Sequence, residues 1–105
     1  MVVVRGRSMS PTLSDGDRLV VRWGALPRAG QLAVVHLPDG PDGPRPVSVK
    51  RATMRVDDGW WVERDNPAEG VDSALVGSIP DRDVLGVVRV RLWPRPGRAA
   101  LKPRG

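Results

Sequence analysis

The alternation of hydrophobic and polar positions along the chain predicts short β-strands separated by turns. From Val47 to Met54, Val47, Val49 and Arg51 fall on one face, and Lys50 falls on the other. The expected strands are Val2–Arg5, Arg18–Trp23, Gln31–Leu37, Val47–Met54, Gly59–Glu63 and Val84–Trp93. No segment sustains a period of about 3.6 residues, so we expect at most one short helical turn, after Ser8 or near Asp81.

Turn-forming residues separate these runs. Asp57-Asp58-Gly59 between two runs is typical of a hairpin. The segment from Leu37 to Pro44, rich in proline, glycine and aspartate, predicts an exposed loop. Frequent turns between short strands indicate an all-β fold, an antiparallel sandwich or barrel.

Length and composition favour one domain. The chain has 105 residues, of which 40% are hydrophobic, enough for one modest core. Residues 1–93 are expected to form that core domain, and residues 94–105, rich in proline, arginine and glycine, a basic tail. Of the adjacent Trp60 and Trp61, one should enter the core and the other should face outward.

Charge and cysteine content restrict the function. The net charge of +5 would attract acidic partners, but it is scattered and lacks interleaved aromatics, so no nucleic acid is expected. The absence of cysteine excludes disulfides, thiol catalysis and zinc–thiolate sites. No apolar run approaches the ~20 residues of a membrane span. We therefore expect a soluble cytoplasmic protein, and peripheral membrane contact stays open.

The candidate chemistry lies in a serine and a distant lysine. The run Ser8-Met9-Ser10-Pro11 presents a serine on a turn, and Lys50 lies within an apolar strand. A serine hydroxyl needs a base, and burial lowers a lysine pKa far enough for it to act as one. The side chain of the adjacent Arg51 is expected on the opposite face. If it came close to Lys50, its positive charge would also lower the pKa of Lys50. The only histidine, His36, has no partner for a triad and is expected to be a plain strand residue.

The chain resembles the type I signal peptidase family of Ser/Lys proteases. Within that family it is most similar to the small soluble proteases that mature nickel-type superoxide dismutase. The matching blocks, in the family's order, are Gly6–Leu13 with Gly16-Asp17, then Val49-Lys50-Arg51, then Gly59–Val62 with Asp65-Asn66-Pro67, Asp72-Ser73, Gly77 and Pro80.

The resemblance implies roles for particular residues. Ser8 would be the nucleophile, its backbone N–H would bind the oxyanion, and Lys50 would be the general base. The substrate peptide would lie extended between Val2–Arg5 and the strand edge at Val47 and Val49. The remaining residues implied are Met9 and Gly6 at the oxyanion and substrate subsites, and Asp65, Asn66, Asp72 and Ser73 as structural support. The resemblance implies no cofactor and no metal.

Some positions depart from the signal peptidase pattern. Gly6 replaces a serine that often completes the oxyanion hole, and Gly70 replaces a serine that orients the lysine. Ala74 stands where an arginine usually follows Asp-Ser, and Arg64 stands in place of a glycine before Asp-Asn. The small maturation proteases typically lack both serines.

The function implied is an endopeptidase that removes an N-terminal propeptide, with a precursor of nickel-type superoxide dismutase as its partner. Signal-peptidase-like processing of another protein is an alternative, as is a weakly catalytic peptide-binding module of the same fold. Taken alone, Ser8 and Ser10 are ordinary turn residues, and Lys50 alone is an edge-strand lysine. A third alternative is a protein that binds nucleic acid or a membrane surface through its basic tail.

Overall fold

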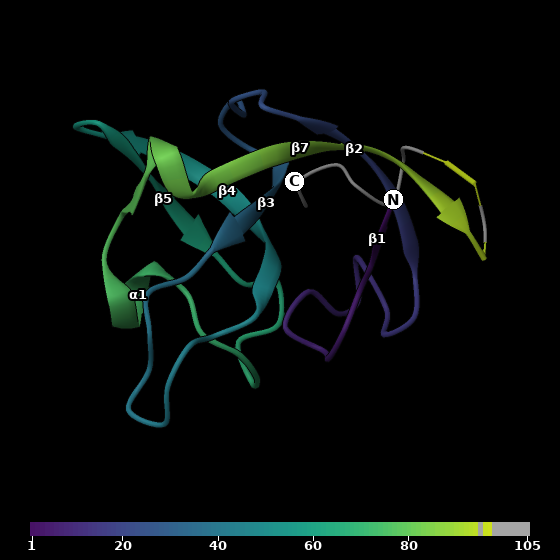
Figure 1. Cartoon of the computed structure of the whole chain (residues 1–105). Helices are drawn as coiled ribbons and strands as arrows, with labels where there is room; N and C mark the ends of the chain where they lie inside the picture. The colour runs from purple at the N-terminus through teal and green to yellow at the C-terminus, as the bar shows by residue number, and fades with distance from the viewer. Residues whose placement is uncertain (95, 98–105) are drawn as a thin grey trace.

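The computed structural model describes residues 1–94 and 96–97, so most of the predicted tail lies outside the described residues. The protein is almost entirely β-structure (Figure 1). The strands are β1 (Val2–Val3), β2 (Arg18–Trp23), β3 (Leu32–His36), β4 (Val47–Val56), β5 (Gly59–Glu63), β6 (Ile79–Pro80) and β7 (Val84–Trp93). A one-turn helix, α1 (Ser73–Val76), and a 3-10 turn at Asp81–Asp83 precede β6 and β7 respectively.

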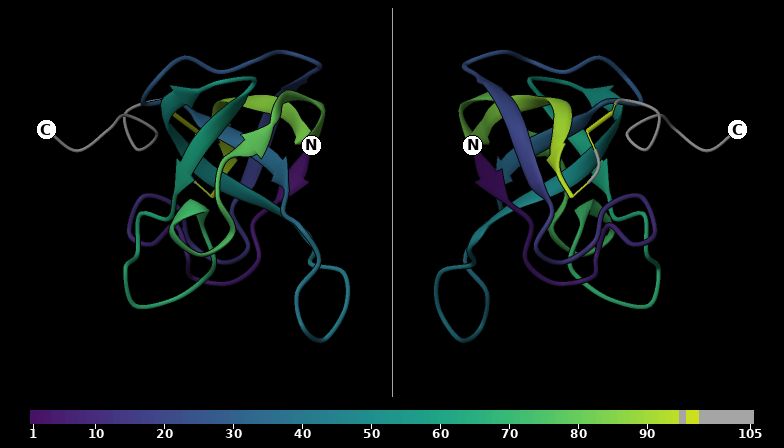
Figure 2. Two further views of the ribbon diagram at one scale, coloured as in Figure 1. Left: turned by 90° about the vertical axis from the view of Figure 1, so that its left-hand side faces the viewer. Right: turned by 90° about the vertical axis from the view of Figure 1, so that its right-hand side faces the viewer.

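All seven strands form one antiparallel sheet in the order β1-β2-β7-β3-β4-β5-β6. The sheet curls strongly on itself, and the loops around residues 7–13, 38–46 and 64–72 project from one end of it (Figure 2). The all-β antiparallel prediction is therefore confirmed, and the three loops are gathered where they can build a site.

Two strand edges near these loops remain open. Within residues 1–94 and 96–97, β1 pairs with β2 alone, so its other edge is free there. β5 pairs with β4 only from Arg51 onward, although β3 pairs with β4 from Val47. Residues 47–50 of β4 therefore have a strand on one side only, among the residues described.

The core has two clusters. One joins Leu19 and Val34 of the sheet to Met9 and Leu13 of the 7–13 loop. The other lies around Val62 and Ile79 and includes Trp60, whereas Trp61 is half-buried. The prediction that one of the two tryptophans enters the core is confirmed for Trp60, but Trp61 is half-buried instead of facing fully outward. The first cluster matters for the site because it anchors the loop that carries Ser8.

The predicted strands agree closely with those observed. The expectation of at most one helical turn is wrong: a 3-10 turn lies at Asp81–Asp83, near the place expected, but α1 at Ser73–Val76 is a second. The bounds of β2, β5 and β7 are as expected, and the 37–44 segment is a loop with one isolated bridge between Gly40 and Gly43. β1 is shorter than predicted. Val4 donates its N–H to the Asp17 carbonyl, but its own carbonyl accepts from the Gly16 N–H instead of from Asp17, so the regular pairing with β2 ends there. Within the described part of the chain, no helix is long and apolar enough to cross a membrane.

Candidate functional site

Ser8 lies on a tight turn just after β1. The Ser10 N–H donates to the Arg7 carbonyl at 3.1 Å, and the Leu13 N–H donates to the Met9 carbonyl at 2.8 Å. Met9 and Leu13 are fully buried. Two core side chains thus anchor the turn, and Ser8 lies on the side of the turn away from that core.

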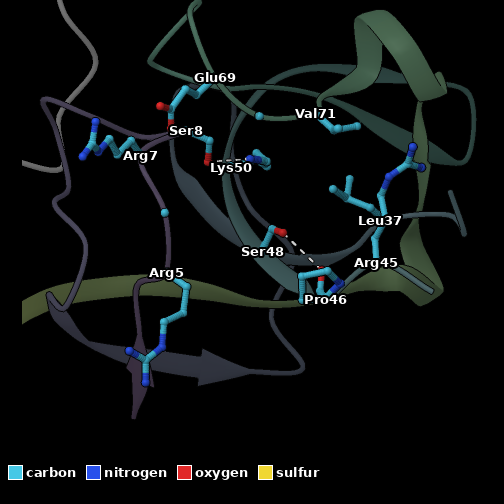
Figure 3. A pocket seen from close by; sticks show the side chains of 12 residues that line it. Arg5, Arg7, Ser8, Leu37, Arg45, Pro46, Ser48, Lys50, Glu69 and Val71 are labelled. Carbon is cyan, nitrogen blue, oxygen red and sulfur yellow. Dashed lines mark hydrogen bonds between the residues drawn. The ribbon is translucent and has the colours of Figure 1, made fainter. Parts of the chain in front are cut away.

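Lys50 comes from the middle of β4, where it pairs with Ala33 of β3. Its side chain is only 3% exposed. The Lys50 Nζ donates a hydrogen bond to Ser8 Oγ at 2.6 Å, across 42 positions of sequence, and Figure 3 shows the two side chains pointing toward each other. The fold therefore brings the predicted serine and lysine into direct contact.

The surroundings of Lys50 disfavour its charge. Burial lowers the pKa of Lys50 from 10.5 to about 8; the charge of Asp72 opposes this shift, and Arg64 adds to it. Arg51 binds Asp65 on the other face of β4, as its alternation with Lys50 predicted. It is not among the groups that shift the pKa of Lys50, and the nearby cation that does so is Arg64. The lysine can therefore hold a neutral amine near neutral pH.

Asp65 and Asn66 fasten the Ser8 turn to the sheet. Asp65 accepts hydrogen bonds from Thr12 Oγ1 at 2.5 Å and from Arg51 at 2.5 and 3.1 Å. The Asn66 backbone N–H donates to the Ser8 carbonyl at 2.8 Å, and its side-chain amide donates to the Arg7 carbonyl at 2.9 Å. These contacts fix the position of Ser8 relative to β4.

Asp72 and Ser73 shape the return of the chain from the site. Asp72 caps α1 by accepting from the Ala74 N–H at 3.1 Å and also accepts from the Arg64 N–H at 3.1 Å. Ser73 Oγ is buried and accepts from the Val62 N–H of β5 at 2.8 Å, so it does not face Lys50. Both residues hold the 64–72 loop against the end of the sheet.

Two glycines lie next to the serine. Gly70 has φ +97°, and a Cβ built there would lie 2.5 Å from Ser8 Cβ and 3.5 Å from Lys50 Nζ. Gly6, with φ +80°, donates its N–H to Asp15 Oδ1 at 2.8 Å. The Gly6 N–H is thus occupied, whereas the Ser8 N–H has no acceptor among the described residues.

A groove runs past Ser8 on both sides. A cavity of about 370 Å³ lies between the 5–8 and 69–71 segments, with Leu37 and Arg45 on its far wall. A second, of about 110 Å³, separates the free edge of β1 from Val47 and Val49 of β4. Ser8 borders both cavities and Lys50 borders the larger one, so the cavity beside the open strand edges adjoins the serine–lysine contact.

The structure brings most predicted site residues together, though not all in the same way. Met9 is a core residue with its sulfur 3.4 Å from the Asp65 N–H, and it also borders the smaller cavity. His36 ends β3 at the surface, 3.7 Å from Asp83. Within residues 1–94 and 96–97, no three His, Asp or Glu side chains gather as a metal site would require.

Arg64 and Thr12 are site residues that sequence reasoning missed. Arg64 was noted only as a departure from a motif, yet it reaches the Gly70 carbonyl at 3.0 Å. Thr12 is buried and holds Asp65. A threonine and an arginine have many ordinary uses, so no sequence signal distinguishes these two before the fold is known.

The comparison with protein families agrees with this geometry. Residues 1–89 match the family described as Peptidase S24-like. No curated protein matches the chain significantly. The match includes Ser8, Lys50 and the whole 64–72 loop. It supports the broader resemblance to serine peptidases of the signal-peptidase type. The match covers most of the length of the chain. The chain therefore belongs to the peptidase S24-like family.

Proposed function

We propose that the protein is a serine endopeptidase in which Ser8 is the nucleophile and Lys50 the general base. The observation that carries this proposal is the 2.6 Å contact between Lys50 Nζ and Ser8 Oγ. A charged lysine could not accept the serine proton, but burial lowers the pKa of Lys50 to about 8. A sizeable fraction is then neutral at cellular pH, and the hydrogen bond reverses so that Ser8 donates.

The chemistry follows from this arrangement. Ser8 Oγ attacks the substrate carbonyl carbon while Lys50 Nζ takes the hydroxyl proton. The ammonium gives that proton to the leaving nitrogen, the C–N bond breaks, and an acyl ester on Ser8 remains. Water then attacks the ester, Lys50 accepts its proton, and the proton returns to Ser8 Oγ as the acid leaves. The free backbone N–H of Ser8 is the donor available to the oxyanion.

The substrate is a peptide in extended conformation. The open edges of β1 and of residues 47–50 in β4 flank the smaller cavity, so a peptide strand entering there finds unpaired backbone groups on both sides. Val47 and Val49 would meet its side chains. This arrangement suits a flexible terminal segment, which can enter as a strand, better than a folded domain.

We propose removal of an N-terminal propeptide, with the precursor of a nickel-type superoxide dismutase as the substrate. The support is the resemblance of the Gly6–Leu13 and Asp65–Gly77 regions to the maturation proteases, including glycine at both position 6 and position 70. Such cleavage would free the N-terminal histidine that binds nickel.

The test is incubation of the purified protein with that precursor and measurement of the product mass. Wild type and Ser10→Ala should release the propeptide, because Ser10 does not touch Lys50. Ser8→Ala should be inactive, and Lys50→Arg nearly so, since arginine stays charged. Cleavage by Ser8→Ala at the wild-type rate would refute the nucleophile. Cleavage of other peptides but not this precursor would refute only the substrate.

A further inference from the structure

Arg64 makes an unusual set of contacts just after β5. Its guanidinium donates from Nη1 to the Gly70 carbonyl and from Nη2 to the Pro67 carbonyl, both at 3.0 Å. Its backbone N–H donates to Asp72 Oδ2 at 3.1 Å. One planar fork thus ties together both ends of the 67–70 segment, which a lysine ammonium cannot do in the same way.

The segment held by Arg64 lies directly on the serine–lysine pair. A methyl group at Gly70 would overlap Ser8 Cβ at 2.5 Å, so the backbone there is already in close contact with Ser8. Gly70 supplies no hydroxyl to orient the lysine. The contact between this backbone and Ser8 adds to the bonds from Asn66 in holding Ser8 Oγ against Lys50 Nζ.

Arg64 also sets the charge around Lys50. Asp72 favours the ammonium form of Lys50, and Arg64 Nη1 lies 3.8 Å from Asp72 Oδ1. Of the other charged groups nearby, Glu69 and three arginines, Arg5, Arg7 and Arg45, border the same cavity. Arg51 is bound to Asp65 on the opposite face. Arg64 therefore offsets the one carboxylate identified as acting on Lys50.

We propose that Arg64 is a positioning residue of this site, which clamps the 67–70 segment over Ser8 and Lys50 and neutralises Asp72. It takes over the task that a lysine-orienting serine would perform at position 70. The inference rests on the proposed function, because a positioning residue presupposes a reaction. The physical effect that it predicts concerns Lys50 alone and can be measured without a substrate. Loosening the clamp admits water and uncovers Asp72, and both changes favour the ammonium.

The chain offers a test that requires no substrate. It contains two lysines, Lys50 and Lys102, so Lys102→Arg leaves one lysine side chain to follow by NMR after labelling with carbon-13 lysine. In that background, Arg64→Gln should raise the pKa of Lys50 by about one unit or more. Arg55→Gln removes the same charge from an exposed pair with Asp81 and should leave the pKa unchanged.

A Lys50 pKa that is the same in folded Arg64→Gln and Arg55→Gln would overturn the proposal. If Arg64→Gln does not fold, Arg64→Lys decides, because it keeps the charge but loses the fork. A smaller rise in the Lys50 pKa is then expected, and no rise overturns the clamp. Failure of the precursor to be cleaved would count against the proposed function and leave this titration result intact.

Discussion

At the scale of single residues, Lys50 is the residue whose burial lowers the stability of the folded protein. Lysine is seldom buried without a carboxylate in contact, and here the nearest partner is a neutral hydroxyl. Because the folded pKa of about 8 lies below 10.5, the unfolded chain binds more protons between these values. Stability should therefore rise with pH across that window, and the full cost is present below it.

Replacing Lys50 by methionine should reveal this cost. The stability of Lys50→Met relative to wild type should fall by about 3 kcal/mol between pH 7 and about pH 10.5, because the cost of burying the ammonium disappears over that range. Urea denaturation at several pH values measures it. Lys102→Met, which removes the other lysine, serves as the control. A gain that is independent of pH would contradict the depressed pKa.

The same titration should appear in catalysis. The rate of cleavage should rise tenfold per pH unit below about 8 and level off above it, because the neutral amine is the base. Single-turnover rates between pH 6 and pH 9 test this. A flat profile over that range would exclude Lys50 as the proton acceptor.

Gly70 is the second residue on which the site depends. Gly70→Ala should abolish cleavage, because the added carbon has no room beside Ser8 Cβ. Gly77→Ala is a matched control: Gly77 also has a positive φ, +81°, but has nothing within 4 Å of its would-be Cβ. Both variants bear backbone strain of about 1–3 kcal/mol, so only contact with Ser8 separates them. Comparable activity in the two would contradict the close packing.

At the scale of elements, the site depends on loops fastened by side chains. Asp65 binds Thr12 of the Ser8 turn and Arg51 of β4, and so links the turn to the strand. Neither loop has a regular hydrogen-bond ladder of its own. A few polar groups therefore add to the core contacts of Met9 and Leu13 in fixing the loops to the sheet, and each should matter more than a surface ion pair.

Asp65→Ala should destabilise the protein by about 3–5 kcal/mol, since it leaves the buried Arg51 without its carboxylate. Thr12→Val removes one hydrogen bond to the same carboxylate and should cost only about 1–3 kcal/mol. Urea midpoints give both values. Equal losses in the two variants would contradict a role for Arg51 in holding Asp65.

The elements were largely predictable, but of the contacts between them only the meeting of Ser8 and Lys50 was anticipated. Alternation of apolar residues predicted β2, β5 and β7 with the observed bounds. β6 was missed because two residues, one of them proline, are too short for a pattern, and the four residues of α1 are too few for a helical period. Ser8 and Lys50 were found by their motifs, whereas Thr12 and Arg64 became visible only when distant loops met.

At the scale of the whole molecule, mostly positively charged side chains border the groove. Arg5, Arg7 and Arg45 border the larger cavity with Glu69 as the opposing carboxylate, and the chain carries +5 overall. Arg45 is held in place by bonds to the Pro38 and Asp39 carbonyls. A basic rim of this kind raises the local concentration of acidic peptides.

Reversing one rim charge should change substrate preference. Arg45→Glu should lower kcat/KM for a peptide with a glutamate beside the cleaved bond about fivefold, and less for the matching glutamine peptide. Arg28→Glu makes the same charge change at an exposed residue outside the groove. The effect should fade at high salt. An equal loss for both peptides would argue against a role of the rim charge.

The bonds from Asp65 to Thr12 and from Asn66 to Ser8 have a consequence for how the protein comes into being. They join positions more than fifty residues apart, so they exist only when both ends of this stretch of chain are in place. A nascent chain that lacks residues 65 and 66 contains Ser8 and Lys50 without the contacts that fasten the Ser8 turn. The proposed proteolytic activity should therefore require the folded protein, which would spare other proteins during synthesis.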